Sequence, residues 1–119
     1  MLHELTPEQA AKLARLWVWM PWQQAISPGG ARWRIDDTDG PTLRILRIRG
    51  YGPDLSDNVT RDGLLRTCRK AWMDDAFAMR SQSGKWKVYV RSGFEEHVFE
   101  GATEDVALLA AILAAPEAT

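Results

Sequence analysis

The side chains that could carry catalytic chemistry are few and far apart in the sequence. Cys68 is the single cysteine, and the two histidines are His3 and His97. A nucleophilic thiol needs a base beside it, and a helix and a strand that touch could bring Cys68 to His97. Cys68 falls on the apolar side of an expected helix, where a cysteine is normally inert. A minor enzyme built on Cys68 and His97 is therefore the third of three interpretations.

Metal-binding patterns are incomplete as well. Structural zinc needs clustered Cys, His and carboxylate ligands, and one cysteine with two distant histidines does not supply them. The segment 36–40 matches part of a calcium loop, but Ile35 replaces the first acidic ligand and Leu46 the bidentate Glu. We interpret this segment as a turn and expect no metal or other cofactor.

Two features could contact nucleic acid. Arg49-Gly50-Tyr51-Gly52 reproduces the first four positions of the RNA-binding octamer of sheet proteins, but Pro53 and Asp54 interrupt the pattern, which favours a loop. Residues 85–91 alternate, so one face of an expected strand carries Lys85, Lys87, Tyr89 and Arg91. This basic face would suit phosphates or an acidic protein, or it is simply solvated. A nucleic-acid-binding protein is the second interpretation.

Three helices are expected to position these residues. The first, 7–20, begins at Thr6-Pro7-Glu8-Gln9, where Thr6 and Gln9 can form a capping box and Pro7 suits the first helical position. The second spans about 59–74. The third follows the N-cap Thr103, with Glu104 and Asp105 in its first turn and an apolar run over 106–115. The third helix is apolar nearly all round, which predicts a place between the sheet and another element.

The strands are expected in two hairpins and a single strand. Residues 32–35 and 42–49 flank the turn at 36–40, with a bulge at Ile45-Leu46, and residues 76–80 and 86–90 flank Ser83-Gly84. Residues 97–100 add one more strand. The predicted fold class is α+β: a mainly antiparallel sheet of about five strands, packed by three helices. Trp17, Trp72 and Trp86 lie on apolar faces and should be buried.

Length and composition bound the class of protein. A chain of 119 residues with 45% hydrophobic and 26% charged residues has the size and composition of one globular domain, 1–119. The sequence shows neither an apolar run long enough to cross a membrane nor a signal peptide, so we expect a cytoplasmic protein without a membrane partner. Charge is uneven: residues 32–91 carry thirteen Lys and Arg against eight Asp and Glu, whereas residues 92–119 carry six acids and no base.

A family resemblance covers about residues 50–115. The order of features is Gly52-Pro53-Asp54-Leu55 before a helix, Trp86, Val88 and Val90 in a strand, and Gly101-Ala102-Thr103 before the Ala/Leu-rich segment 107–111. In this order the chain resembles small bacteriophage proteins described as having a phage α-β-α sandwich domain. The resemblance implies no active site, cofactor or substrate. It implies a phage context, in which small proteins often bind a host or viral protein, including bacterial defence machinery.

The leading interpretation is a non-enzymatic protein that binds and modulates a larger host or viral protein, with an inhibitor of bacterial defence as one form of it. Six tryptophans and an Arg-rich middle segment motivate it, because Arg, Tyr and Trp dominate interface hot spots. We expect the two hairpins to lie in one sheet and to join their side chains into one partner surface. Trp19 and Trp22, beside the end of the first helix, either cover a second layer of the same domain or extend this surface. The predicted binding residues are Arg44, Arg47, Arg49, Tyr51, Lys87, Tyr89, Arg91, Trp19 and Trp22.

Overall fold

The computed structural model describes residues 5–73, 77–81 and 83–116. For residues 77–80 it describes the backbone but not the side chains. The chain divides into two compact units, Met1–Gly63 and Leu64–Thr119. Each combines helices with a three-stranded antiparallel sheet, so the predicted α+β class is confirmed. No helix in the described residues is long and apolar enough to cross a membrane. That residues 1–119 act as one domain stays a prediction.

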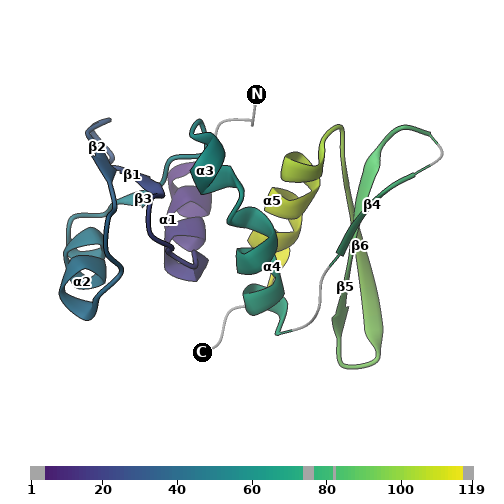
Figure 1. The fold of residues 1–119 in the computed structure, drawn as a ribbon. Coiled ribbons are helices and arrows are strands. Elements are labelled where there is room, and N and C mark those ends of the chain that lie inside the picture. The colour runs from purple at the N-terminus through teal and green to yellow at the C-terminus, as the bar shows by residue number, and fades with distance from the viewer. Residues whose placement is uncertain (1–4, 74–76, 82, 117–119) are drawn as a thin grey trace. The chain divides into compact units, whose positions relative to one another are not determined.

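In unit 1, short helices and strands surround a small hydrophobic core. Its helices are α1 (Pro7–Leu16), α2 (Gly40–Ile48) and the single turn α3 (Asn58–Arg61), and its strands are β1 (Gln24–Ile26), β2 (Arg32–Arg34) and β3 (Gly52–Pro53). The sheet has the order β2-β1-β3, and in Figure 1 it lies between α1 and α2. Ala25, Ile35 and Leu46 form a buried cluster, against which Trp19, Trp33, Leu43 and Tyr51 pack.

Unit 2 is layered around an apolar helix. It contains α4 (Leu64–Trp72), β4 (Phe77–Arg80), β5 (Trp86–Ser92), β6 (Glu95–Gly101) and α5 (Glu104–Ala114). The helix α5 contacts α4 as well as the β4-β5-β6 sheet, and Figure 1 shows it between them. This confirms the prediction for the apolar third helix. It begins where the Thr103 hydroxyl accepts a hydrogen bond from the Val106 amide.

The predicted strand 42–49 is wrong, because this segment is the helix α2. The Asp39 carboxylate accepts a hydrogen bond from the Thr42 amide at 2.7 Å, and Pro41 occupies the first turn. Both are helix-start signals, although Asp39 lies in the segment 36–40 that the sequence pattern predicts as a hairpin turn. The Ile45-Leu46 step is not a bulge: a helical period turns Leu46 into the core and Ile45 outward. The proposed single sheet of two hairpins is therefore wrong as well.

The other helices begin where expected but are shorter or divided. Both hydrogen bonds of the Thr6/Gln9 capping box are present, yet α1 ends at Leu16 rather than at residue 20. Trp17 is the C-cap, with an extended backbone conformation, and its indole nitrogen donates a hydrogen bond to the side-chain oxygen of Gln23 at 3.1 Å. The predicted helix 59–74 is split into α3 and α4 before Leu64, and its last residue, 74, lies outside the described residues.

The remaining strands follow the prediction closely. The expected segments 86–90 and 97–100 lie within β5 and β6, which pair from Trp86↔Gly101 to Ser92↔Glu95. The strand predicted at 76–80 is β4, with residue 76 outside the described residues. Two short strands, β1 and β3, were missed. Trp17 and Trp72 are buried as predicted, whereas Trp86 is only partly buried.

Candidate functional site

The helix α2 presents an exposed surface that combines cations with aliphatic side chains. Leu46 is buried and Leu43 is packed against the unit 1 core, so these two residues fix the inner side of the helix. The side chains on the other positions face solvent, and Ile45 is 41% and Ile48 73% exposed. We call the exposed set the α2 surface, which consists of Arg44, Ile45, Arg47, Ile48 and Arg49.

The C-terminal end of α2 is closed by a Schellman motif. The Gly50 amide donates to the Arg47 carbonyl at 3.2 Å and the Tyr51 amide to the Leu46 carbonyl at 2.9 Å. Gly50 has a φ of 72°, a left-handed conformation that glycine adopts without strain. Arg49-Gly50-Tyr51-Gly52 is thus a helix-capping sequence rather than the start of an RNA-binding strand, and it fixes where Arg49 leaves the helix.

The aromatic residues predicted in the binding surface divide into packed and exposed ones. Tyr51 is partly exposed, and its ring packs edge-on against Trp33 with centroids 6.0 Å apart. Trp19 packs against the unit 1 core and lies 6.3 Å from the Trp17 ring. Both have a structural role in unit 1. Trp22 is 63% exposed with a φ of 74°, and its carbonyl accepts a hydrogen bond from Arg34.

The predicted residues of the second hairpin lie on β5, within unit 2. Val88 and Val90 are buried, so Lys87, Tyr89 and Arg91 share the opposite, open face, as expected from strand alternation. This face is not purely basic, however. Lys87 is opposite Glu100, with 3.5 Å between ammonium and carboxylate, and Arg91 is opposite Glu96 in the register. The adjacent carboxylates offset the cations, which the sequence of β5 alone did not reveal.

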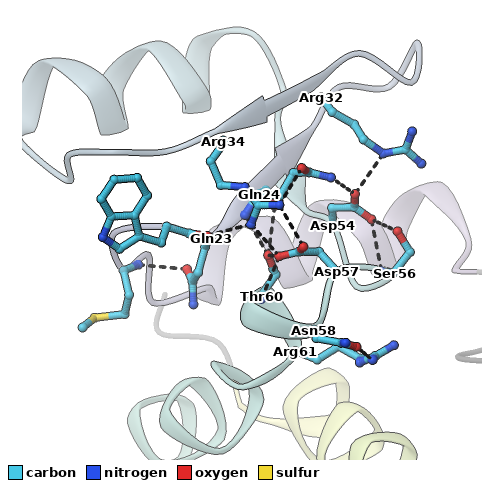
Figure 2. A network of polar contacts seen from close by, with 12 residues as sticks. Gln23, Gln24, Arg32, Arg34, Asp54, Ser56, Asp57, Asn58, Thr60 and Arg61 are labelled. Carbon is cyan, nitrogen blue, oxygen red and sulfur yellow. Dashed lines mark hydrogen bonds and ion pairs between the residues drawn. The ribbon is translucent and has the colours of Figure 1, made fainter.

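A partly buried polar network, absent from the sequence prediction, joins elements of unit 1 (Figure 2). Asp54 is 4% exposed and accepts hydrogen bonds from Gln24 at 2.6 Å, Arg32 at 3.0 Å, and the amide and hydroxyl of Ser56. These donors join β1, β2 and the segment after β3. Burial acts to raise the pKa of Asp54, but the hydrogen bonds from Ser56, Gln24 and Arg32 outweigh it and hold the pKa below its ordinary value.

Asp57 makes the second half of this network. Its two carboxylate oxygens face the two terminal nitrogens of Arg34, each at 3.0 Å, which is a bidentate ion pair. It also caps α3 by accepting hydrogen bonds from the amide and hydroxyl of Thr60. The hydrogen bond from Arg34 is the main cause that lowers the pKa of Asp57, with burial opposing it. The spacing Asp57-x-x-Thr60 was a readable cap signal in the sequence.

The buried side-chain atoms of the network are all hydrogen-bonded within the protein. Among the described residues, no buried side-chain nitrogen or oxygen lacks a hydrogen-bond partner. Gln23, 2% exposed, accepts from the Trp17 indole and from the Met20 amide at 2.8 Å. We therefore assign the network to the structure of unit 1, where it positions β2 and the segment before α3, and not to chemistry on a substrate.

The two catalytic candidates in the described part of the chain, Cys68 and His97, do not form a hydrogen-bonded pair of nucleophile and base. Cys68 is buried on α4, and burial raises its pKa to about 11, so the thiol stays protonated at neutral pH. His97 stacks near Trp72, with ring centroids 5.2 Å apart, and its Nε2 lies 3.7 Å from the Glu95 carboxylate. His3 lies outside the described residues.

A metal site is likewise not assembled by the residues that the structure describes, which contain no cluster of three or more His, Cys, Asp or Glu suited to a metal ion. The carboxylates of the segment 36–40 have local roles. Asp37 accepts a hydrogen bond from the Asp39 amide at 3.1 Å, and Asp39 is the N-cap of α2. The hydrogen bond from Thr42 is the main cause that lowers the pKa of Asp39.

Comparison with known proteins adds no relative: no protein-family model, curated protein or solved structure matches the chain. The candidate site therefore depends on the geometry alone.

Of the predicted binding residues, the structure brings Arg44, Arg47 and Arg49 together at α2, and it adds Ile45 and Ile48. The strand period predicted for this segment does not single out the two isoleucines, whereas a helical period places 41, 45 and 48 on one side.

Proposed function

We propose that this protein is a non-enzymatic binding protein that docks its α2 surface onto a larger protein. The observation that carries the proposal is the exposure of Ile45 and Ile48, at 41% and 73%, between arginines on the same helix. Aliphatic side chains held in water add nothing to the core, and contiguous exposed apolar surface is typical of interaction sites. Arginine is enriched at protein interfaces.

The charge of α2 indicates the chemistry of the partner. Arg44, Arg47 and Arg49 are exposed, and none of them makes an ion pair within the described residues, while the segment 40–49 contains no acid. Arg47 and Arg49 stabilise the helix dipole near its C-terminus, but this role does not require the neighbouring isoleucines. We infer a partner with a shallow apolar patch and carboxylates at its rim, since guanidinium groups bind carboxylates in a bidentate manner.

A protein partner explains this surface better than nucleic acid does. Phosphate contacts would use the arginines but leave Ile45 and Ile48 without a role. The second basic strip that a nucleic acid could follow, on β5, faces Glu96 and Glu100. The proposal keeps the phage context expected from the sequence, with a bacterial host or viral protein as the partner, including a defence protein, and a cytoplasmic location belongs to it.

The test is affinity capture from host lysate followed by binding measurements with the purified partner. The variants are Ile48→Ser, Arg47→Glu and Arg47→Lys, and Lys87→Glu is the matched control, because it reverses a partly exposed cation outside α2. Each is first shown to melt like the parent. We expect Ile48→Ser and Arg47→Glu to lose capture, Arg47→Lys to weaken it, and Lys87→Glu to retain it.

Two outcomes would contradict the proposal. Undiminished capture by both Ile48→Ser and Arg47→Glu would exclude the α2 surface as the docking site. Captured nucleic acid, bound with an affinity that falls linearly in log salt and is indifferent to Ile48→Ser, would favour the nucleic-acid alternative.

A further inference from the structure

The turn between β5 and β6 places one aromatic side chain at the apex of a tight hairpin. The strands pair up to Ser92↔Glu95, which leaves a two-residue turn of Gly93 and Phe94. Gly93 has a φ of 63° and Phe94 does not have a positive φ, which is the pattern of a type II′ turn. Such a turn requires glycine at its first central position and makes no demand for an aromatic at the second.

Phe94 has no packing role in unit 2. It is fully exposed, at 108%, whereas the apolar side of the same hairpin is buried through Val88 and Val90. A phenylalanine in water gains nothing from folding, and a small polar residue would complete this turn equally well. The two seven-residue strands hold the turn in place, so the ring is presented on a rigid support.

The charge beside Phe94 is acidic and differs from that of the α2 surface. Glu95 follows directly, with its side chain 82% exposed, and Glu96 is exposed after it. Arg91 lies opposite Glu96 in the register and offsets one charge, so the turn keeps a net negative charge. Carboxylates here repel phosphates, which disfavours nucleic acid and anionic lipid as ligands of this tip.

We propose that the β5–β6 tip is a second docking surface, in which Phe94 enters an apolar pocket of a protein partner whose rim carries Lys or Arg to meet Glu95 and Glu96. Two observations support this proposal: the exposed aromatic side chain on a rigid hairpin and the carboxylates of Glu95 and Glu96 beside it. Interface hot spots typically consist of an aromatic side chain that is buried on binding and surrounded by a polar rim. This surface does not depend on the α2 surface, and its partner needs the opposite charge.

The experiment places the photoreactive residue p-benzoylphenylalanine at position 94. The matched control is the same residue at Ser83, which is exposed in the other turn of this sheet. Proteins crosslinked in host lysate at 94 but not at 83 are identified and purified, and their dissociation constants are measured with the parent, with Phe94→Ala and Phe94→Leu, and with the double variant Glu95→Lys/Glu96→Lys. Anionic vesicles and duplex DNA serve as further probes of the parent.

We expect Phe94→Ala to weaken binding of the purified partner by roughly tenfold or more and Phe94→Leu to weaken it less. The double lysine variant should also weaken binding, and the parent's affinity should fall with added salt. Equal crosslinking at 83 and 94, an affinity of Phe94→Ala within about twofold of the parent, or tighter binding by the double lysine variant would overturn the proposal. Binding of vesicles or DNA through Phe94 would overturn it too.

Failure here is distinguishable from failure of the proposed function. The Arg47→Glu and Ile48→Ser variants change only the α2 surface and leave Phe94 in place. A partner that responds to Phe94→Ala and not to Arg47→Glu supports the tip alone, and a protein that responds only to the α2 variants contradicts the tip.

Discussion

The two units of the chain are stabilised by different kinds of interior. Unit 1 buries Gln23, Asp54 and Thr60 and joins its short strands through their hydrogen bonds. Unit 2 is filled mainly by α5, whose buried side chains are all apolar: Ala107, Leu108, Leu109, Ala111 and Ile112. Hydrogen bonds to a carboxylate have a fixed geometry, so few other side chains can replace their partners, and they depend on the protonation state of the carboxylate. Apolar packing depends on the shape and volume of the side chains. The units should therefore respond differently to truncation and to pH.

Removing the largest apolar anchor of unit 2 should have the greatest effect. Trp72 is 8% exposed, packs against Phe99 and donates its indole N–H to the Ala111 carbonyl at 2.8 Å. We expect Trp72→Ala to lower the free energy of unfolding by about 3–5 kcal/mol, through lost burial and a cavity. Chemical denaturation measures the loss, and residue-resolved amide exchange locates it. An unchanged unfolding free energy would show that Trp72 is not part of the core.

In unit 1, the corresponding substitution removes the carboxylate of Asp54 rather than a large apolar side chain. Asp54→Ala leaves Gln24, Arg32 and Ser56 without their acceptor, and we expect a loss of about 2–3 kcal/mol at neutral pH. The control is Asp36→Ala, because Asp36 is exposed. Exchange protection should fall in β1 and β2. Equal stability of the two variants would mean that the network contributes nothing.

The same carboxylates set the acid sensitivity of unit 1. The pKa values of Asp54 and Asp57 lie below the value that they have in an unfolded chain, about 3.9. The unfolded chain therefore takes up protons first, and the stabilisation is present above about pH 4 and lost as pH falls through the lowered values. Asp54→Ala should flatten this dependence in a series of unfolding experiments from pH 6 down to pH 2.

At alkaline pH we expect unit 2, rather than unit 1, to lose stability, because unit 2 contains the buried thiol of Cys68. The pKa of Cys68 is raised from 9.0 to about 11, so stabilisation is complete below pH 9 and is lost as pH rises toward 11. We expect a loss on the order of 1–2 kcal/mol between pH 8 and 10.5 that is absent in Cys68→Ala. Parallel pH profiles of the parent and this variant would contradict the prediction.

The smallest effect is expected on the open face of the unit 2 sheet. Lys87 and Glu100 form a cross-strand ion pair at 3.5 Å between two partly exposed side chains. Pairs of this kind contribute about 0.2–1 kcal/mol, so Lys87→Ala should barely move the thermal midpoint. A double-mutant cycle with Glu100→Ala measures the coupling. A coupling well above 1 kcal/mol would require a network beyond this pair.

Sequence patterns predicted those elements whose signals are local. The Thr6/Gln9 capping box, the alternation of β5 and the N-cap Thr103 each lie within a few residues, and the structure contains all of them. The segment 42–49 failed because its isoleucines fit a strand with a bulge as well as a helix with an exposed apolar side, and tertiary packing through Leu46 decides between the two.

The candidate sites were harder to predict for a physical reason. The partners of Asp54 lie up to thirty residues away along the chain, as Gln24 does, so no local period reveals the network. The carboxylates that offset Lys87 and Arg91 come from the neighbouring strand. The exposure of Ile48 and Phe94 depends on which face packs inward, and that is a property of the folded unit rather than of the residue type.

The way in which α2 is attached has an evolutionary consequence. Its inner side and both ends hold it in place, through Leu43 and Leu46, the Asp39 cap and the Gly50 closure. The outward positions 44, 45, 47 and 48 carry little of the stability of unit 1, so substitutions there are nearly free of cost to folding. These positions can therefore vary during evolution, and under the proposed function they could change with a partner, while the scaffold under them stays the same.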